Sequence, residues 1–205
     1  HKNMRYARRR TPAENGFGNG WLFFAWDSER AGLNGLQNQS LTMDNTGKRT
    51  SLGPTFLNAE LHQNPDYHLR FSDRLVKHCF NGGALTPEGV SKSWNELAQS
   101  IYLGLICESA RWGDLHTGTP EVREGNWQKQ LDKENNIWIP QRTEVLIGQL
   151  AKRNFSAKKP VFPQFQPFGG QINEGTAVSI RIFNDTIFSP VKGDIYYTID
   201  GSDPR

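Results

Sequence analysis

Residues 1–50 are irregular and rich in Gly, Asn and Arg, apart from one intensely apolar run, Trp21-Leu-Phe-Phe-Ala-Trp26. Asn19-Gly20 is a turn signal before the run, and Asp27-Ser-Glu29 breaks the apolar character directly after it. A short apolar run with these flanks predicts a buried β-strand. We expect this strand to carry Asp27 at its C-terminal end.

Between residues 53 and 154 the apolar positions recur with the 3.6-residue period of α-helices. Several expected helices start with a Pro after a capping or turn residue. Pro suits the first helical position because it lacks only an N–H that would be unpaired there anyway. These start signals are Gly53-Pro54, Asn64-Pro65, Thr86-Pro87 and Thr119-Pro120.

Residues 65–80 and 86–105 each carry an apolar stripe, and we expect them to form a helical hairpin that faces a core. Asn81-Gly-Gly83 lies between them and tolerates the left-handed backbone that ends a helix. A polar helix is expected over residues 119–135, and a last helix from Pro140 to near residue 155.

The chain changes character after this helical part. Residues 156–160 have the composition of a short linker. In residues 161–205 apolar residues alternate with polar ones, for example at 178–182 and 195–199, which predicts the strands of a β-sandwich. We therefore expect an α+β chain with a helical domain portion at 1–155, the linker at 156–160, and a β-sandwich module at 161–205.

Composition limits the possible partners. The chain has 24 Lys and Arg against 21 Asp and Glu, so its net charge of +3 does not call for a nucleic-acid partner. The one dense basic cluster, Arg5 to Arg10, either binds phosphate or an acidic partner or is a solvated charge run between two strands. The mean hydropathy of -0.66 and the lack of a long apolar run exclude a membrane span within these residues.

Cys79 and Cys107 are too few for a disulfide scaffold and lack the spacing of a zinc or redox motif. We expect each to be a small buried hydrophobic residue, with a disulfide between them as the alternative. The Trp residues of the helical part are explained better by core packing than by sugar stacking: Trp94, Trp112, Trp127 and Trp138.

Asp27 is the sharpest candidate for chemistry. A carboxylate at the end of a buried strand can hold a divalent cation rigidly, and Mg²⁺ needs only one or two carboxylates beside phosphate oxygens and water. Glu29 supplies a second acid two residues on. The alternative is that Asp27 caps a helix or a turn. The closely spaced glycines at 16–20 match neither a Walker loop nor a kinase Gly-rich loop.

Four stretches resemble proteins similar to the spore-coat kinase CotH. Phe23-Phe-Ala-Trp-Asp-Ser-Glu29 resembles the aromatic-rich strand that leads to Trp-Asp-x-Asp or Asp-x-Glu in that family. Residues 68–88, Glu108-Ser-Ala-Arg-Trp-Gly-Asp114 and Pro140-Gln-Arg-Thr143 resemble the helical tail of large exported bacterial proteins with such a domain. The resemblance covers residues 1–155.

This resemblance implies the mainly α-helical C-lobe of an atypical protein-kinase-like fold, with a short β element. Asp27 would hold the catalytic Mg²⁺, as the Asp of a kinase Asp-Phe-Gly motif does. Glu29 stands where the family has a second Asp and keeps a carboxylate on a longer arm. Asn3 would correspond to an Asn-rich segment before the strand and contact the ATP. The nucleotide lobe and the catalytic Asp would lie upstream of His1, so the chain alone is expected to be inactive.

The end of the chain resembles a second family. Residues 193–205 are similar to the Ile-Tyr-Tyr-Thr-x-Asp-Gly-Ser-x-Pro signature of the chitobiase and β-hexosaminidase C-terminal type module. This module is an immunoglobulin-like β-sandwich appended to exported hydrolases and adhesins, and we expect it to continue past Arg205. Asp200 is a turn residue in this interpretation, and the alternative is that Asp200 and Asp203 ligate calcium.

Two functions follow. The first is an exported, cell-surface or extracellular bacterial CotH-like protein that, when intact, transfers phosphate from ATP to a protein hydroxyl with Mg²⁺. The second is a catalytically silent cell-surface scaffold or glycan-binding adhesin. The expected partners are a protein substrate or a cell-surface component and further domains of the same polypeptide, and neither a nucleic acid nor a membrane span is expected.

Overall fold

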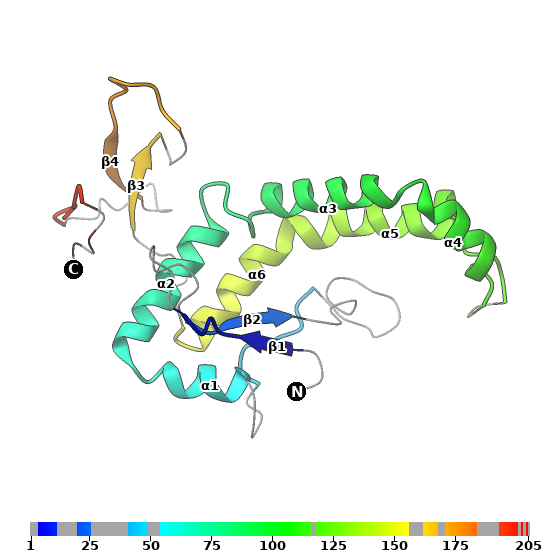
Figure 1. Cartoon of the computed structure of the whole chain (residues 1–205), viewed down its shortest axis with the longest axis horizontal. Helices are drawn as coiled ribbons and strands as arrows, with labels where there is room; N and C mark the ends of the chain where they lie inside the picture. Colours follow the sequence, from blue (N-terminus) through cyan, green and yellow to red (C-terminus); the bar gives the residue numbers. More distant parts are fainter. Residues whose placement is uncertain are drawn as a thin grey trace.

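The computed structural model describes residues 4–11, 20–25, 41–48, 54–115, 118–155, 162–167, 171–183, 193–200, 202 and 204. Within them the fold is α+β, with a series of helices from α1 to α6 and two small antiparallel sheets. Figure 1 shows that α3, α4 and α5 form a long arm extending away from α1 and α2, while β3 and β4 lie beyond the C-terminal end of α2.

Three of the four predicted helix starts are confirmed. The helices α1 (Pro54–Leu61), α2 (Pro65–Cys79) and α3 (Pro87–Ile101) each begin at the expected Pro. The Asn64 Oδ1 accepts from the Asp66 backbone N–H at 2.9 Å, and the Thr86 Oγ1 accepts from the Gly89 N–H at 3.2 Å. These side chains satisfy N–H groups that a helix leaves unpaired at its start.

The turn between α2 and α3 uses its glycines for two different reasons. Asn81 and Gly82 have positive φ angles of 52° and 72°, the left-handed conformation expected at a helix end. Gly83 is needed for space, because a Cβ there would lie 2.4 Å from the Lys77 carbonyl oxygen.

The core lies between α2 and α6 (Ile139–Lys152). Leu75 and Cys79 of α2 are buried against Leu150 of α6, with partly buried aromatic and aliphatic residues around them. The prediction that residues 65–80 face a core is therefore confirmed. Cys79 is a buried free thiol, as expected, but Cys107 is free and exposed, so the prediction that it is buried was wrong.

The predicted hairpin of residues 65–80 with 86–105 was wrong, because α3 contacts α6 and the helical segment before it instead. The Asn135 side-chain amide donates to Asn95 Oδ1 at 3.0 Å, and the Asn95 amide donates back at 3.2 Å. The expected single helix over 86–105 is also interrupted at residues 102–103, and α4 (Gly104–Trp112) follows.

The predicted boundaries of the last two helices were wrong. Residues 119–122 are not helical, because the Glu121 N–H donates to the Gly113 carbonyl at 2.8 Å and ties this stretch to the end of α4. The helix starts at Arg123 and continues without a break as η1 (Arg123–Trp127), α5 (Gln128–Lys133), η2 (Glu134–Trp138) and α6.

Pro140 therefore lies inside a continuous helix instead of starting one. A Pro inside a regular α-helix removes one hydrogen bond and presses on the carbonyl four residues earlier. The turn directly before it, η2, is a π-helix, whose wider turn relieves that clash. The π-helical turn explains why the Pro does not end the helix.

The first sheet pairs β1 (Met4–Ala7) with β2 (Leu22–Ala25), so the strand predicted in residues 21–26 is confirmed. Its predicted burial was wrong. Leu22, Phe23 and Phe24 are 41%, 51% and 51% exposed. The reason is that the described sheet has two strands, so each strand has a single neighbouring strand beside it.

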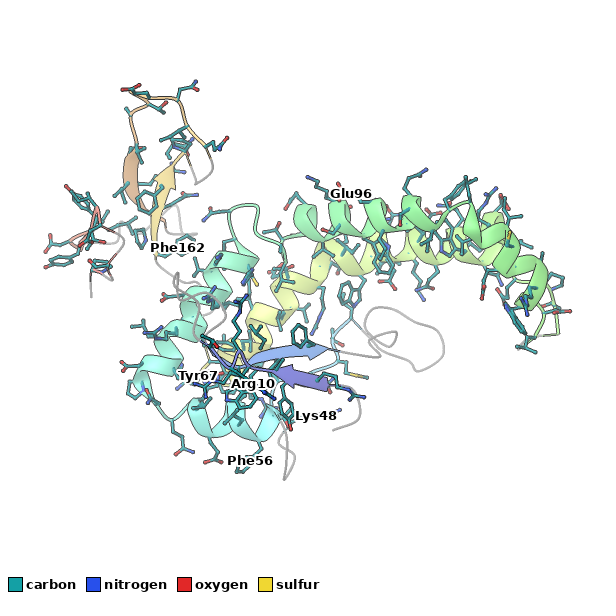
Figure 2. The ribbon with its side chains drawn as sticks, in the orientation of Figure 1. Arg10, Lys48, Phe56, Tyr67, Glu96 and Phe162 are labelled. Carbon is teal, nitrogen blue, oxygen red and sulfur yellow. The ribbon has the colours of Figure 1, made fainter. Side chains whose placement is uncertain are left out.

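The second sheet pairs β3 (Phe162–Gln166) with β4 (Ser179–Phe183), which confirms the alternation read at 178–182. Phe162 is buried against Phe80 at the end of α2, with ring centroids 5.5 Å apart (Figure 2). The strand predicted at 195–199 is absent from the structure of these residues, because no described strand pairs with them. The predicted linker, 156–160, lies outside the described residues.

No helix among the described residues is long and apolar enough to cross a bilayer.

Candidate functional site

The predicted site residues Asn3, Asp27 and Glu29 lie outside the described residues. The structure describes the framework on either side of the stretch that contains Asp27 and Glu29. On one side is β2, which ends at Ala25, and on the other is the segment 41–48. We call residues 41–48 the anchored segment, because α6 holds it by several hydrogen bonds.

The β2 side of the framework is set by antiparallel pairing with β1. Ala25 is the register partner of Met4, and Leu22 that of Ala7. The Tyr6 ring meets the Trp21 ring edge to face at a centroid distance of 5.7 Å. The backbone is therefore in strand geometry up to two residues before Asp27.

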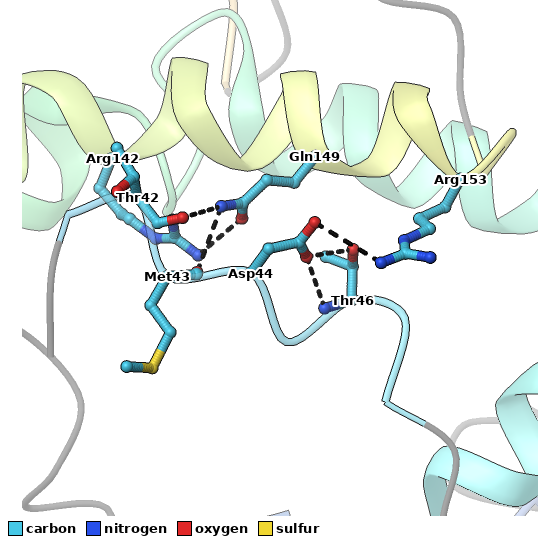
Figure 3. A network of polar contacts seen from close by, with 7 residues as sticks. All are labelled: Thr42, Met43, Asp44, Thr46, Arg142, Gln149 and Arg153. Carbon is cyan, nitrogen blue, oxygen red and sulfur yellow. Dashed lines mark hydrogen bonds and ion pairs between the residues drawn. The ribbon is translucent and has the colours of Figure 1, made fainter.

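Arg142 and Gln149 of α6 hold the other side (Figure 3). The Arg142 guanidinium donates to the Leu41 carbonyl at 3.0 Å and to Gln149 Oε1 at 3.2 Å. The Gln149 amide donates to the Thr42 and Met43 carbonyls at 2.9 Å and 3.2 Å. Gln149 is only 6% exposed, so these hydrogen bonds are made away from water, where leaving them unmade would be costly.

Asp44 is the described carboxylate of the anchored segment, and it is already engaged. Its Oδ1 accepts from the Thr46 N–H at 2.9 Å and from the Thr46 hydroxyl at 2.6 Å, while Oδ2 lies 4.0 Å from the Arg153 guanidinium. The Thr46 hydroxyl and N–H, together with Arg153, lower the pKa of Asp44 below its ordinary value. Asp44 closes a turn, and one of its oxygens is fully used there.

The Arg142 guanidinium experiences two opposing effects. Partial burial lowers its pKa, and the negative charge of Asp44 raises it. An arginine starts from so high a value that it stays charged at neutral pH. The anchor is therefore a charge-assisted one, stronger than a neutral hydrogen bond.

Sequence reasoning identified the stretch that contains Arg142 but missed its role and missed Gln149. Pro140-Gln-Arg-Thr143 was visible as part of a resemblance, with no indication of what the Arg binds. Gln149 offered no signal, because one polar residue in an amphipathic helix is normal. The partners lie more than a hundred residues away in sequence, at separations of 101 for Arg142 and 107 for Gln149.

The stretches that are expected, from resemblance alone, to form a CotH-like helical tail lie in two places. Residues 68–88 and 140–143 meet, since the Thr143 hydroxyl donates to the Leu85 carbonyl. Residues 108–114 lie at the far end of the arm, where they line an open groove together with residues 121–127. The basic cluster lies on and after β1, and Arg8, Arg9 and Arg10 are exposed.

Other candidate ligands do not gather in the described part of the chain. Its His, Cys, Asp and Glu residues form no group of three that could hold a metal. The Asp200 carboxylate accepts from the Ser202 N–H and hydroxyl at 3.0 Å and 2.7 Å, which lowers its pKa and fits the predicted turn. Asp203 lies outside the described residues.

Comparisons of the sequence with protein-family models and with curated proteins, and of the fold with solved structures, found no match.

Proposed function

We propose that this chain is part of an exported CotH-like protein that, when intact, transfers phosphate from ATP to protein hydroxyls with Mg²⁺. Residues 1–155 would form the helical C-terminal part of the kinase-like domain, and residues 161–205 would begin a β-sandwich module. Asp27 would hold the metal, with Glu29 beside it and Asn3 toward the nucleotide. The observation that carries the proposal is the strand β2, which ends two residues before Asp27.

The anchored segment adds support. In sequence, the stretch containing Asp27 and Glu29 begins just after a paired strand and ends at the anchored segment. Arg142 and Gln149 of α6 hold this segment by three hydrogen bonds and are joined to each other by a fourth. Active-site groups on loops need such fixed ends, because small displacements of a reacting group slow catalysis strongly. In this proposal Arg142 and Gln149 are positioning residues.

The described carboxylate nearest in sequence to Asp27 and Glu29 fits a structural role better than a metal site. The Asp44 carboxylate accepts two hydrogen bonds from Thr46 and lies near the Arg153 guanidinium. It is therefore poorly placed to bind a cation. Asp27 and Glu29 would therefore be the metal ligands of this part of the chain. Bound Mg²⁺ would neutralise charge on the nucleotide phosphates. A nucleotide-binding lobe and a catalytic base would come from elsewhere in the polypeptide.

The test is phosphate transfer by the full-length protein. With γ-labelled ATP and Mg²⁺ we expect label in the protein itself or in added protein substrate. Asp27→Asn should reduce labelling by about 100-fold or more, the order found when one electrostatic stabiliser of a transition state is removed. Asp132→Asn is the matched control, because Asp132 is an exposed carboxylate on α5 that contacts only Gln128 in the described structure.

Equal labelling by the Asp27→Asn and Asp132→Asn proteins would remove Asp27 from the mechanism. Absence of labelling in the parent protein, with Mg²⁺ and with Mn²⁺, would contradict kinase activity itself. Circular dichroism of each variant separates a loss of activity from a loss of folding.

A silent scaffold or glycan-binding adhesin is the second candidate, and exposed apolar side chains favour it. Leu97, Leu103 and Ile106 on the arm are 58%, 76% and 52% exposed, and Tyr196 and Tyr197 near the C-terminus are 74% and 68% exposed. Large exposed apolar surfaces are typical of interaction sites. Unlabelled parent protein that still binds a cell-surface component would support this function.

A further inference from the structure

In the arm, which comprises α3, α4, η1 and α5, helices α3 and α5 run side by side (Figure 1). Several apolar side chains of α3 are partly exposed there. Trp94, Leu97 and Ile101 of α3 are 39%, 58% and 45% exposed, although they share a stripe with Ala98, which is buried. Two packed helices cover one face of each other, and a second apolar face needs a further partner.

A groove lies at the far end of the arm, between α4 and η1. Its volume is about 720 Å³, within the range of ligand-binding clefts. Leu105, Trp112, Val122 and Trp127 supply its apolar walls. A smaller apolar hollow between α3 and α5 also has Trp127 in its lining. We call the larger one the arm groove.

The groove is built into the fold. The Glu121 N–H donates to the Gly113 carbonyl at 2.8 Å, which brings residues 121–122 against the end of α4. A Cβ at Gly113 would lie 2.5 Å from the Ser109 carbonyl oxygen and 2.9 Å from that of Glu121. Only a glycine allows this approach of the two walls.

The charges of the arm groove have one sign. Glu108 and Glu121 line it, and none of the described residues that line it is Lys, Arg or His. Of the two nearby arginines, Arg111 lies 4.8 Å above the ring of Trp112, which is a wall of the groove, whereas Arg123 pairs with Glu124 and lies 4.0 Å above the Tyr102 ring. The groove therefore combines apolar walls with two carboxylates, of which that of Glu121 also accepts a hydrogen bond from the Asn126 side-chain amide.

We propose that the arm groove receives an amphipathic helix of a protein partner that presents a Lys or Arg among aliphatic side chains. The apolar face of such a helix would cover the exposed walls and complete a three-helix packing along the arm. Its cation would meet Glu108 and Glu121. The arm is then a docking element, and this proposal does not depend on the role of Asp27.

Charge argues against the other occupants. Nucleic acid and anionic lipid would be repelled by the two carboxylates. A second copy in a two-fold dimer would bring the same patch to both sides, and so Glu108 and Glu121 would face carboxylates. A basic amphipathic helix would experience neither of these electrostatic repulsions.

The probe is a synthetic amphipathic peptide of Leu and Lys, about 18 residues long so that it can form a helix. Fluorescence anisotropy with the full chain should give saturable binding. A peptide with Glu in place of Lys should bind at least about tenfold more weakly, as expected from electrostatic complementarity. Glu108→Lys should weaken binding of the Lys peptide by a similar factor.

Glu96→Lys is the matched control, because Glu96 lies on the outer side of α3, away from α5 (Figure 2). The Glu96→Lys substitution should leave the affinity for the Lys peptide unchanged. The proposal is overturned by equal affinity for the two peptides, by equal weakening in both variants, or by no binding of the Lys peptide. It is also overturned if the chain binds anionic vesicles, or self-associates in sedimentation and loses this association in Glu108→Lys.

Discussion

His62 lies among aromatic rings with both ring nitrogens buried and without a hydrogen bond. Its ring stacks on Phe155 at a centroid distance of 3.7 Å and meets the rings of Tyr67, His68 and Phe71 at 5.1, 5.6 and 4.7 Å. Burial lowers the pKa of His62 below its ordinary value of 6.5, and the charge of His68 lowers it further. Protonation of His62 is therefore less favourable in the folded chain than in the unfolded chain.

This environment predicts a pH dependence of stability. The unfolded chain binds a proton at His62 near pH 6.5, whereas the folded chain resists it until a lower pH. The free energy of unfolding should therefore fall as the pH drops below about 6.5. In His62→Phe, which keeps the ring and removes the titrating group, denaturant unfolding between pH 7.5 and 5 should show a smaller fall.

The same substitution at His78, which is outside this group of rings, is the control. At pH 7.5 the His62→Phe protein should be about as stable as the parent, because the ring nitrogens make no hydrogen bond that is lost. An unchanged fall in stability toward pH 5 in His62→Phe would show that protonation of His62 does not oppose folding.

At the scale of elements, α6 is the helix that joins the parts of the framework. One face buries Leu150 against α2, and another holds the anchored segment through Gln149. Gln149→Leu should remove the hydrogen bonds that Gln149 makes to two backbone carbonyls and to Arg142, at a cost of about 1–3 kcal/mol in unfolding free energy.

The anchored segment should also become more accessible in Gln149→Leu. We expect faster tryptic cleavage after Lys48, which is exposed at the end of this segment, as followed by mass spectrometry. Gln141→Leu is the control on the same helix, because the Gln141 amide donates only to the Ile137 carbonyl of its own helix among the described residues. Equal stability and equal cleavage in both variants would mean that Gln149 does not hold the segment.

Elements could be predicted from the sequence where the signal is local. Asn64-Pro65 and Thr86-Pro87 combine a capping side chain with a Pro, and both helices begin there. Thr119-Pro120 has the same two residue types as Thr86-Pro87, but no helix begins there. The hydrogen bond from the Glu121 N–H to the Gly113 carbonyl holds this stretch in a non-helical conformation. The helix through Pro140 was missed because a π-helical turn cannot be read from apolar spacing.

At the scale of the whole molecule, the apolar pattern predicted which residues favour burial. It did not predict which of them are covered by another element of the fold. The run at Trp21 reads as buried, yet Phe23 and Phe24 are half exposed beside a single paired strand. The stripe on α3 is likewise covered along only part of its length. The candidate metal residue Asp27 could be proposed from its place after the apolar run, whereas the anchor at Arg142 depends on contacts across the chain.

Magnesium-dependent ATP binding by the intact protein tests the central claim most directly, because it requires no knowledge of the protein substrate. Calorimetric titration with ATP should give saturable binding with Mg²⁺, binding weakened at least about tenfold by chelation of the metal, and a similar weakening in Asp27→Asn but not in Asp132→Asn. The same affinity in the parent and in Asp27→Asn, or ATP binding that does not depend on Mg²⁺, would contradict the assignment of Asp27 as the metal ligand.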